Sequence, residues 1–341
     1  MKNFIFLLLV FTPLVSHSQE IEDLWTDVKY QKVQEVELIG ELRADAKIDP
    51  TTIHPFLSPR LIRVSNGEML LYDFNIKELY RVQAADLTNS VKIGEGQGRG
   101  PGEYEFIGSI GLDDSHRVYG LDTQLLRLNR WNNSGDDHKI FDLKSGGLPG
   151  KLAVGREIVV KYSSVGPSDN LLGILDKDGN LEKTFYSFNN WNGVRSPMLY
   201  EGQIAASDDH IVYASSNFGV ILGFDYDGNL LFERGMIEPI NGLKMEIRRS
   251  GSSTSSSVQS GSLRTAEDIE IYDDRIYVLY SGKEQLFGNR IDLYDIHSGD
   301  YIGSYQTEEN LVSFSIDNEI LYGLAQDEES GLNVVVHYYL N

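Results

Sequence analysis

Four glycines at every second position, Gly94, Gly96, Gly98 and Gly100, make the segment 94–106 (GEGQGRGPGEYEF) the first candidate for chemistry. A phosphate-binding loop needs glycines that admit the anion to the backbone amides, and a following helix whose N-terminus attracts negative charge. The spacing here matches neither common phosphate-loop motif, and a Pro-Gly-Glu sequence and a predicted strand follow it. We therefore interpret the glycines as structural, needed for positive φ and close packing. The larger side chains remain candidates for ligand binding: Arg99, Glu103 and Tyr104.

The segment 188–202 places an aromatic ring and a cation among asparagines and glycine. Trp191 and Arg195 lie there outside any predicted strand. An indole plane beside hydrogen-bonding side chains suits a sugar or a peptide ligand. A tryptophan folded back over the edge of a sheet is the alternative interpretation.

The segment 238–267 is long, rich in serine and locally basic. It carries Arg248, Arg249 and Arg264, with no acidic residue between Ile247 and Arg264, in a chain of net charge −21. Guanidinium groups on such a segment can form charge-assisted hydrogen bonds with a carboxylate, sulfate or phosphate of a ligand. The alternative is a mobile serine-rich insertion that binds nothing.

No residue pattern predicts a metal or cofactor site. The segments DKDGN (176–180) and DYDGN (225–229) resemble the start of a calcium loop, but they lack its third acidic ligand and its distant glutamate. Both are better explained as Asp-Gly hairpin turns. The histidines lack metal-ligand spacing, and no G-x-S-x-G nucleophile motif occurs. We therefore predict no cofactor from these motifs.

The elements that must position these residues follow a repeat, because one short apolar run recurs six times. Its first copies are EMLLYD (68–73) and RVYGLD (117–122), and its last are RIYVLY (275–280) and EILYGL (319–324). Between equivalent residues the steps are 48, 41, 53, 64 and 45 residues. Such a spacing is typical of repeat architectures with one supersecondary unit per repeat.

Each repeat unit contains four predicted strands. Alternation such as Val220, Leu222 and Phe224 puts one row of side chains on each face of a sheet. Four strands in about 40 to 50 residues are typical of a propeller blade, so the sequence predicts an all-β, six-bladed β-propeller with four-stranded blades. The last unit lacks its outermost strand, which the N-terminal strand at about 32–41 can supply to close the ring. The alternative, two αβ domains, lacks a sustained helical periodicity.

The second repeat unit carries a recognisable pattern over residues 93–131. It contains the Gly-Pro-Gly-Glu-aromatic sequence, an Asp-containing turn, and a strand that ends at Asp122, matched by Asp73 in the first unit. This pattern resembles the six-bladed propellers of the NHL-repeat and TolB-like group found among exported bacterial proteins. The group includes binding scaffolds, lyases and lactonases, so the resemblance implies a fold and leaves the activity open.

The candidate residues are expected on one face of the ring. Connections from the outer strand of one blade to the inner strand of the next all emerge on the same face of a propeller. Besides the glycine-rich segment, the sequence predicts four such connections, at 144–151, 188–202, 238–267 and 307–310. All the candidate ligand-binding residues belong to these connections.

The N-terminus predicts export. A positive charge and an apolar run at 4–11 precede the small residues Ser16 and Ser18, which indicates a signal peptide at 1–18, cleaved near Ser18. The rest, 19–341, is then a single domain in the periplasm or outside the cell. The apolar run is shorter than the roughly 20 residues that span a bilayer, so we expect no transmembrane segment in the mature chain. An uncleaved N-terminal anchor is the alternative.

The charge of the chain limits the classes of partner that it can bind. The chain has no cysteine, and its 51 acidic residues against 30 basic ones repel nucleic acid and anionic membranes. The absence of a catalytic motif favours a monomeric, non-catalytic binding module for a protein, peptide or glycan. The alternative is a metal-assisted lyase, lactonase or hydrolase that holds a single divalent cation in the central channel.

Overall fold

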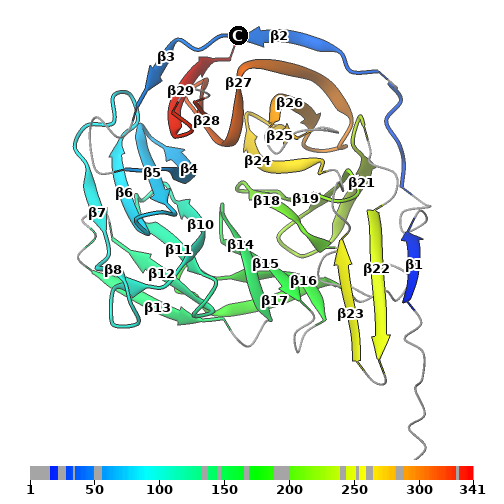
Figure 1. Ribbon diagram of the computed structural model, residues 1–341, viewed down its shortest axis with the longest axis horizontal. Coiled ribbons are helices and arrows are strands. Elements are labelled where there is room, and N and C mark those ends of the chain that lie inside the picture. Colours follow the sequence, from blue (N-terminus) through cyan, green and yellow to red (C-terminus); the bar gives the residue numbers. More distant parts are fainter. Residues whose placement is uncertain are drawn as a thin grey trace, which may run out of the picture.

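The computed structural model shows an all-β ring of sheets (Figure 1). It describes residues 16–21, 28–33, 35–49, 56–132, 135, 137–143, 147–164, 169–187, 200–238, 243–250, 253–258, 264–281, 288–327 and 330–340. In this part of the chain, no helix is long and apolar enough to cross a membrane.

Four separate antiparallel sheets of four strands form most of the ring. The first sheet contains β4 (Pro59–Ser65), β5 (Glu68–Asp73), β6 (Glu78–Gln83) and β7 (Val91–Ile93). The second contains β10 (Ile107–Leu112), β11 (Val118–Asp122), β12 (Arg127–Trp131) and β13 (His138–Asp142). The third contains β14 (Leu148–Val154), β15 (Ile158–Ser164), β16 (Asn170–Leu175) and β17 (Leu181–Ser187). The fourth contains β18 (Gly202–Ala206), β19 (Ile211–Ser215), β20 (Val220–Phe224) and β21 (Leu230–Gly235).

The rest of the ring is one eight-stranded sheet. Its strands, in spatial order, are β24 (Ala266–Tyr272), β25 (Arg275–Tyr280), β26 (Gly288–Asp295), β27 (Tyr301–Asp317), β28 (Ile320–Gln326), β29 (Asn333–Tyr339) and β3 (Ala46–Ile48). The eighth strand, β2 (Leu38–Leu42), pairs in parallel with β27. Two small sheets complete the described strands: β8 (Gly96–Gln97) with β9 (Glu103–Tyr104), and β1 (Ser16–Ile21) with β22 (Leu243–Ser250) and β23 (Ser253–Val258).

The prediction of six four-stranded blades is therefore wrong. The described chain has four blades of four strands, and strands of the last two repeat units are joined in the eight-stranded sheet. The cause is β27, because the predicted connection at 307–310 is continuous strand. That connection contains neither Gly nor Pro, whereas 94–106 and 144–151 contain both. The N-terminal half of β27 pairs with β26 and its C-terminal half with β28.

The innermost strands contact one another in a closed ring. Around the centre lie β4, β10, β14, β18, β24 and β27 (Figure 1). The hydroxyl oxygen of Ser315, in the C-terminal half of β27, accepts a hydrogen bond from the backbone N–H of Val64 on β4 at 2.9 Å. The first and last repeat units are therefore joined directly at the centre.

A segment near the N-terminus, residues 28–33 and 35–48, lies along the outside of the ring, and we call it the N-terminal band. The side chain of Gln31 donates hydrogen bonds to the carbonyl oxygens of Gly235 and Gly299 at 2.8 and 2.9 Å. Farther along, β2 pairs with β27, and β3 pairs antiparallel with β29. The strand that completes the C-terminal sheet is thus β3, and the prediction of 32–41 placed it too early in the chain.

Two other predictions concern segments that the structure describes only in part. Residues 1–15 of the predicted signal peptide lie outside the described residues, and Ser16–Ile21 forms β1. The predicted insertion at 238–267 contains the antiparallel pair β22 and β23, which Figure 1 draws beside the ring.

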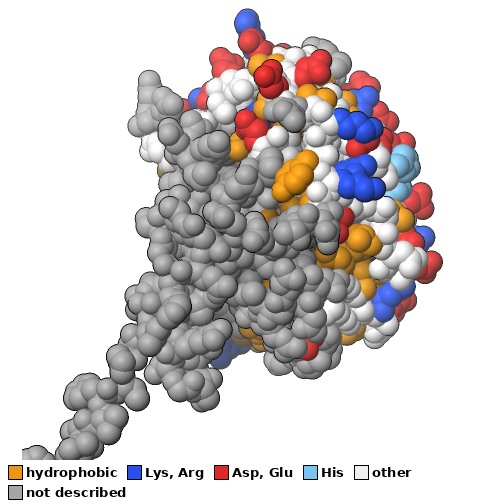
Figure 2. Space-filling model, turned by 90° about the vertical axis from the view of Figure 1, so that its right-hand side faces the viewer, with side chains coloured by type: hydrophobic (Ala, Val, Ile, Leu, Met, Phe, Trp, Pro, Cys, Tyr) orange, Lys and Arg blue, Asp and Glu red, His pale blue; other side chains and the backbone are white. Residues whose placement is uncertain are grey.

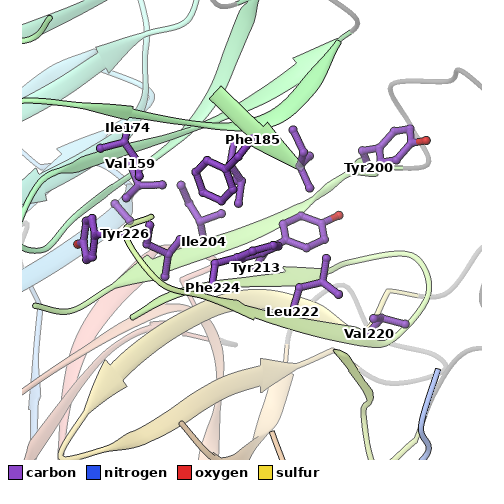
Figure 3. Packing of buried hydrophobic residues seen from close by; sticks show 14 of the residues in the cluster. Val159, Ile174, Phe185, Tyr200, Ile204, Tyr213, Val220, Leu222, Phe224 and Tyr226 are labelled. Atoms are coloured by element: carbon purple, nitrogen blue, oxygen red, sulfur yellow. The ribbon is translucent and has the colours of Figure 1, made fainter. Parts of the chain in front are cut away.

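Neighbouring sheets pack through the side chains that alternate along their strands. Between the third and fourth sheets, Val159 and Phe185 face Tyr213 and Phe224 (Figure 3). The rings of Phe185 and Phe224 meet edge to face, with centroids 5.3 Å apart. Equivalent apolar layers lie between the other neighbouring sheets and between the two halves of the eight-stranded sheet. Burial of these layers supplies the main driving force for folding, because the chain contains no disulfide.

Buried aspartates hold the connections that enter the ring. Asp122, at the end of β11, accepts hydrogen bonds from the backbone N–H groups of Glu105, Gln124 and Leu125 at 2.8, 3.1 and 2.9 Å. Asp73 makes equivalent bonds at the end of β5, to backbone groups on both sides of its strand. The matched aspartates of the first two repeat units are therefore structural residues.

Candidate functional site

The glycine-rich segment 94–106 folds onto itself. The backbone N–H of Glu95 donates to the carbonyl oxygen of Gly102 at 2.9 Å, and that of Gly98 to the carbonyl oxygen of Tyr104 at 3.0 Å. The N–H of Gly102 donates to the His138 ring at 2.7 Å. Because these amides already have acceptors within the fold, they do not form a cradle for a phosphate.

Its three larger side chains contact the protein itself. Arg99 is mostly exposed and forms an ion pair with Glu105. The carboxylate of Glu103 accepts a hydrogen bond from the N–H of Gly100 at 2.6 Å, inside the same segment. Tyr104 is fully buried, its hydroxyl oxygen accepts from the N–H of Leu79 at 3.0 Å, and the structure places it in the core.

The structure describes the other candidate ligand-binding residues to different extents. Trp191 and Arg195 lie outside the described residues. Arg248 and Arg249 lie on β22, for which the structure describes the backbone alone. Arg264 precedes β24 and lies at the wall of a cavity.

This cavity, of about 470 Å³, lies at one end of the central channel. It is lined by residues at the beginnings of the innermost strands, which is the face where the predicted connections enter the ring. Its charged lining residues come from four of the six innermost strands, β4, β14, β18 and β24, or from segments next to them: Arg60, Arg63, Lys151, Lys161, Glu201, Arg264, Glu267 and Asp268. Five are cations and three are anions, although the whole chain carries a net charge of −21. Figure 2 shows acidic and basic side chains interspersed over the face that it draws.

Arg63 and Asp268 form a two-pronged ion pair across the channel. The two guanidinium nitrogens of Arg63 lie 3.0 and 3.2 Å from the carboxylate oxygens of Asp268. The hydroxyl of Ser313 and the N–H of Phe314 also donate to this carboxylate, at 2.5 and 3.1 Å. Burial opposes the charge on Asp268, but Arg63 and these hydrogen bonds lower the pKa of Asp268 below its ordinary value. Both charges are therefore neutralised within the protein.

A second group of charges lies at the rim. Arg264 contacts the carboxylate of Glu201 at 2.9 Å and that of Glu267 at 3.2 Å. Burial raises the pKa of Glu267, and the charge of Arg264 opposes that shift. Because Arg264 and Glu201 are both partly exposed, this pair can open to a ligand at modest cost.

Two lysines complete the wall. Lys161 on β15 is 2% exposed, and Lys151 on β14 lies directly opposite it in the antiparallel register. Burial lowers the pKa of Lys161 to about 7, with a further lowering from the charge of Lys151. Burial also lowers the pKa of Lys151. A buried amine that titrates near neutral pH in a cavity is a common feature of functional sites.

Most of these residues were not singled out from the sequence. A signal was nevertheless present, because Lys161 interrupts the apolar run IVVKYSS of a strand, and Arg63 lies within RLIRVS. A charge on a strand that is otherwise buried marks a position that faces the channel. Without the ring order, the sequence could not indicate that these strands, distant from one another along the chain, converge at one cavity.

The arrangement suits an anion better than a metal ion. Cations from β4, β14 and β15 converge on the cavity, and they repel a divalent cation. Throughout the described ranges, no group of three or more His, Asp or Glu side chains is placed to hold a metal ion.

Comparisons with known proteins bear on the fold. No protein-family profile matches the chain, and no curated protein sequence matches it. A streptogramin B lyase structure has a TM-score of 0.53 at 11% identity, covering 87% of this chain and 97% of that one. A protein from Bacteroides fragilis described as a putative exported protein has a TM-score of 0.52 at 13% identity, covering 92% of this chain and 98% of that one. The WD40 repeats of RRP9 have a TM-score of 0.52 at 8% identity, covering 89% and 99%.

These similarities establish a β-propeller. Identities this low show the fold alone, because propellers support many unrelated functions. The narrower resemblance to the NHL-repeat and TolB-like group stays a prediction.

Proposed function

We propose that the protein is an exported, non-catalytic binding module that takes a negatively charged protein, peptide or glycan at the loop-rich end of its ring. Export is inferred from the N-terminal sequence pattern. The observation that carries the proposal is the open cavity of about 470 Å³, in which five basic and three acidic side chains converge from several blades of the ring. A cavity with few, well-placed polar groups is the usual form of a ligand site.

The charges at the rim favour binding over the metal-assisted alternative. Arg60 and Arg264 line the cavity, and Arg264 is 39% exposed. At short range, cations at such a rim attract the acidic groups of a partner, and they contribute more when the contact excludes water. The ligand is therefore expected to carry carboxylate, sulfate or phosphate groups.

The test uses the purified chain on arrays of immobilised acidic and neutral peptides and glycans. We expect retention on a subset of the acidic members, falling at least tenfold in the double variant Arg60→Ala/Arg264→Ala. The matched control is Arg99→Ala, which removes an exposed arginine away from the cavity, and it should bind as wild type does.

Two results would contradict the proposal. One is binding that the double variant retains in full, which would place the contact elsewhere on the protein. The other is the absence of any retained member at physiological ionic strength, because a charge-dependent site must bind measurably under those conditions.

A further inference from the structure

The cavity holds two cations whose charges the protein does not balance. Lys151 and Lys161 are cross-strand partners in the register of β14 and β15, and both line the cavity. Directly opposed residues of an antiparallel pair have neighbouring side chains on the same face, where like charges destabilise the fold. Lys161 is 2% exposed, so its ammonium group is also largely removed from bulk water.

The carboxylates of the cavity are engaged by arginines. Asp268 pairs with Arg63, and Glu201 and Glu267 both contact Arg264. Among the described residues, no carboxylate lies within ion-pair distance of Lys151 or Lys161. The two lysines are thus charges of the site that have no carboxylate partner. Among the described residues, the partly buried Arg60 is a third such cation of the cavity.

Holding the buried Lys161 and the partly buried Lys151 side by side without a carboxylate partner is unfavourable, and the lowered pKa values of both amines express that cost. An anion placed between the ammonium groups would relieve both the desolvation and the mutual repulsion. A pair of ammonium groups on adjacent strands can donate several hydrogen bonds to one oxyanion.

We propose that Lys151 and Lys161 bind an oxyanion, a carboxylate or a phosphate group, of the ligand that enters the cavity. This inference rests on the proposed function and names the group that the site recognises. Arg63 and Arg264 also line the cavity, and each already has a carboxylate partner.

The subsite is pH-dependent, because the oxyanion binds the ammonium form of Lys161. The other charged groups that line the same cavity are Arg60, Arg63, Lys151, Glu201, Arg264, Glu267 and Asp268. Affinity is therefore highest below pH 7 and falls as the pH rises and Lys161 loses its proton. The negative charge of Glu201 raises the pKa of Lys161 and so opposes the lowering by burial and by Lys151.

The test measures the pKa of Lys161 directly, in the full chain labelled with ¹³C-lysine, from the Cε resonance followed by NMR. Sodium chloride, sodium acetate and sodium phosphate are used alone at equal ionic strength. An anion present at ten times its dissociation constant, and bound by the ammonium form alone, raises the pKa by about one unit. We expect such a rise in acetate, in phosphate or in both, relative to chloride.

Three variants test whether the rise in pKa comes from the two lysines. Lys161→Met removes the titrating resonance, and Lys151→Met should leave Lys161 titrating but reduce the effect of the anion at least fivefold. The matched control Lys139→Met lies on the outer strand β13, with a side chain 54% exposed, and should keep the full response. A rise in phosphate alone identifies a phosphate subsite, and a rise in acetate alone identifies a carboxylate subsite.

An identical Lys161 pKa in all three salts would overturn the inference. The wild-type titration decides this without any variant, so a variant that fails to fold does not weaken the test. Failure here with successful array binding would remove the lysine subsite and leave the binding module. A response here with no array binding would leave the anion site and remove the macromolecular ligand.

Discussion

Replacing Lys161 by methionine should stabilise the folded protein, and the gain should depend on pH in a defined direction. The ordinary lysine pKa of 10.5 falls to about 7 in the folded state because of burial and the nearby Lys151. Methionine retains the apolar stem of lysine and has no charge to bury. The substitution therefore isolates the free energy of holding this ammonium group inside the ring.

The size of this stabilisation follows from the linkage between proton binding and folding. Below about pH 7 the amine is protonated in both states, and a difference of three to four pKa units corresponds to a cost of about 5 kcal/mol in the folded state. Between pH 7 and 10.5 the unfolded chain binds the proton that the folded protein has released, so wild-type stability rises with pH. The advantage of the variant should thus be about 5 kcal/mol at pH 6 and about 2 kcal/mol at pH 9.

Urea unfolding at pH 6, 7.5 and 9, followed by tryptophan fluorescence and circular dichroism, measures the difference. The control Lys139→Met removes a lysine whose side chain is 54% exposed, and it should stay within about 0.5 kcal/mol of wild type at every pH. A Lys161→Met protein that is less stable than wild type at pH 6 would refute the reasoning. So would a gain that does not change with pH.

Two further predictions concern the connections that enter the ring, and both are measured by urea unfolding. Asp122→Ala removes the acceptor of three backbone N–H groups and should lower the free energy of unfolding by about 3 kcal/mol. The control Asp227→Ala, at a side chain 87% exposed, should change that free energy little. Equal stabilities of the two variants would refute a structural role for Asp122. Gly94→Ala should cost at least about 1 kcal/mol more than Gly67→Ala. Both glycines have φ near +75°, but a Cβ on Gly94 would lie 2.7 Å from the carbonyl oxygen of Gly102, and one on Gly67 meets nothing within 4 Å. Equal losses would show that close packing is not what requires Gly94.

The sequence predicted individual strands well, because strand alternation is a local pattern, but it predicted too many separate blades. Alternation at Val220, Leu222 and Phe224 correctly indicated a strand, and the matched aspartates Asp73 and Asp122 do end strands in the first two units. The last two units are joined because residues 307–310 contain no Gly or Pro to end the strand. The spacing of the repeats gives no information on this point.

The candidate site was predicted less well. Arg264 lines the cavity, and its role in binding stays a prediction. Tyr104 was chosen by its position beside glycines, whereas it is buried against Trp131. Lys161 on β15 and Asp268 on β24 belong to different sheets, and they line the same cavity because the closed ring brings these sheets around one centre. Proximity of this kind is a property of the ring, and no local pattern encodes it.

The N-terminal band has a consequence for the order in which the protein is made. Gln31 bonds the carbonyl oxygen of Gly299, 268 positions along the chain, and β3 pairs with the last strand, β29. The ribosome therefore makes the band long before its partners, so the band stays unpaired until β29 has been synthesised. Contacts this distant in sequence form slowly, and the ring can close only after β29 has been synthesised. A factor that shields the band during this interval would be expected to raise the yield of folded protein.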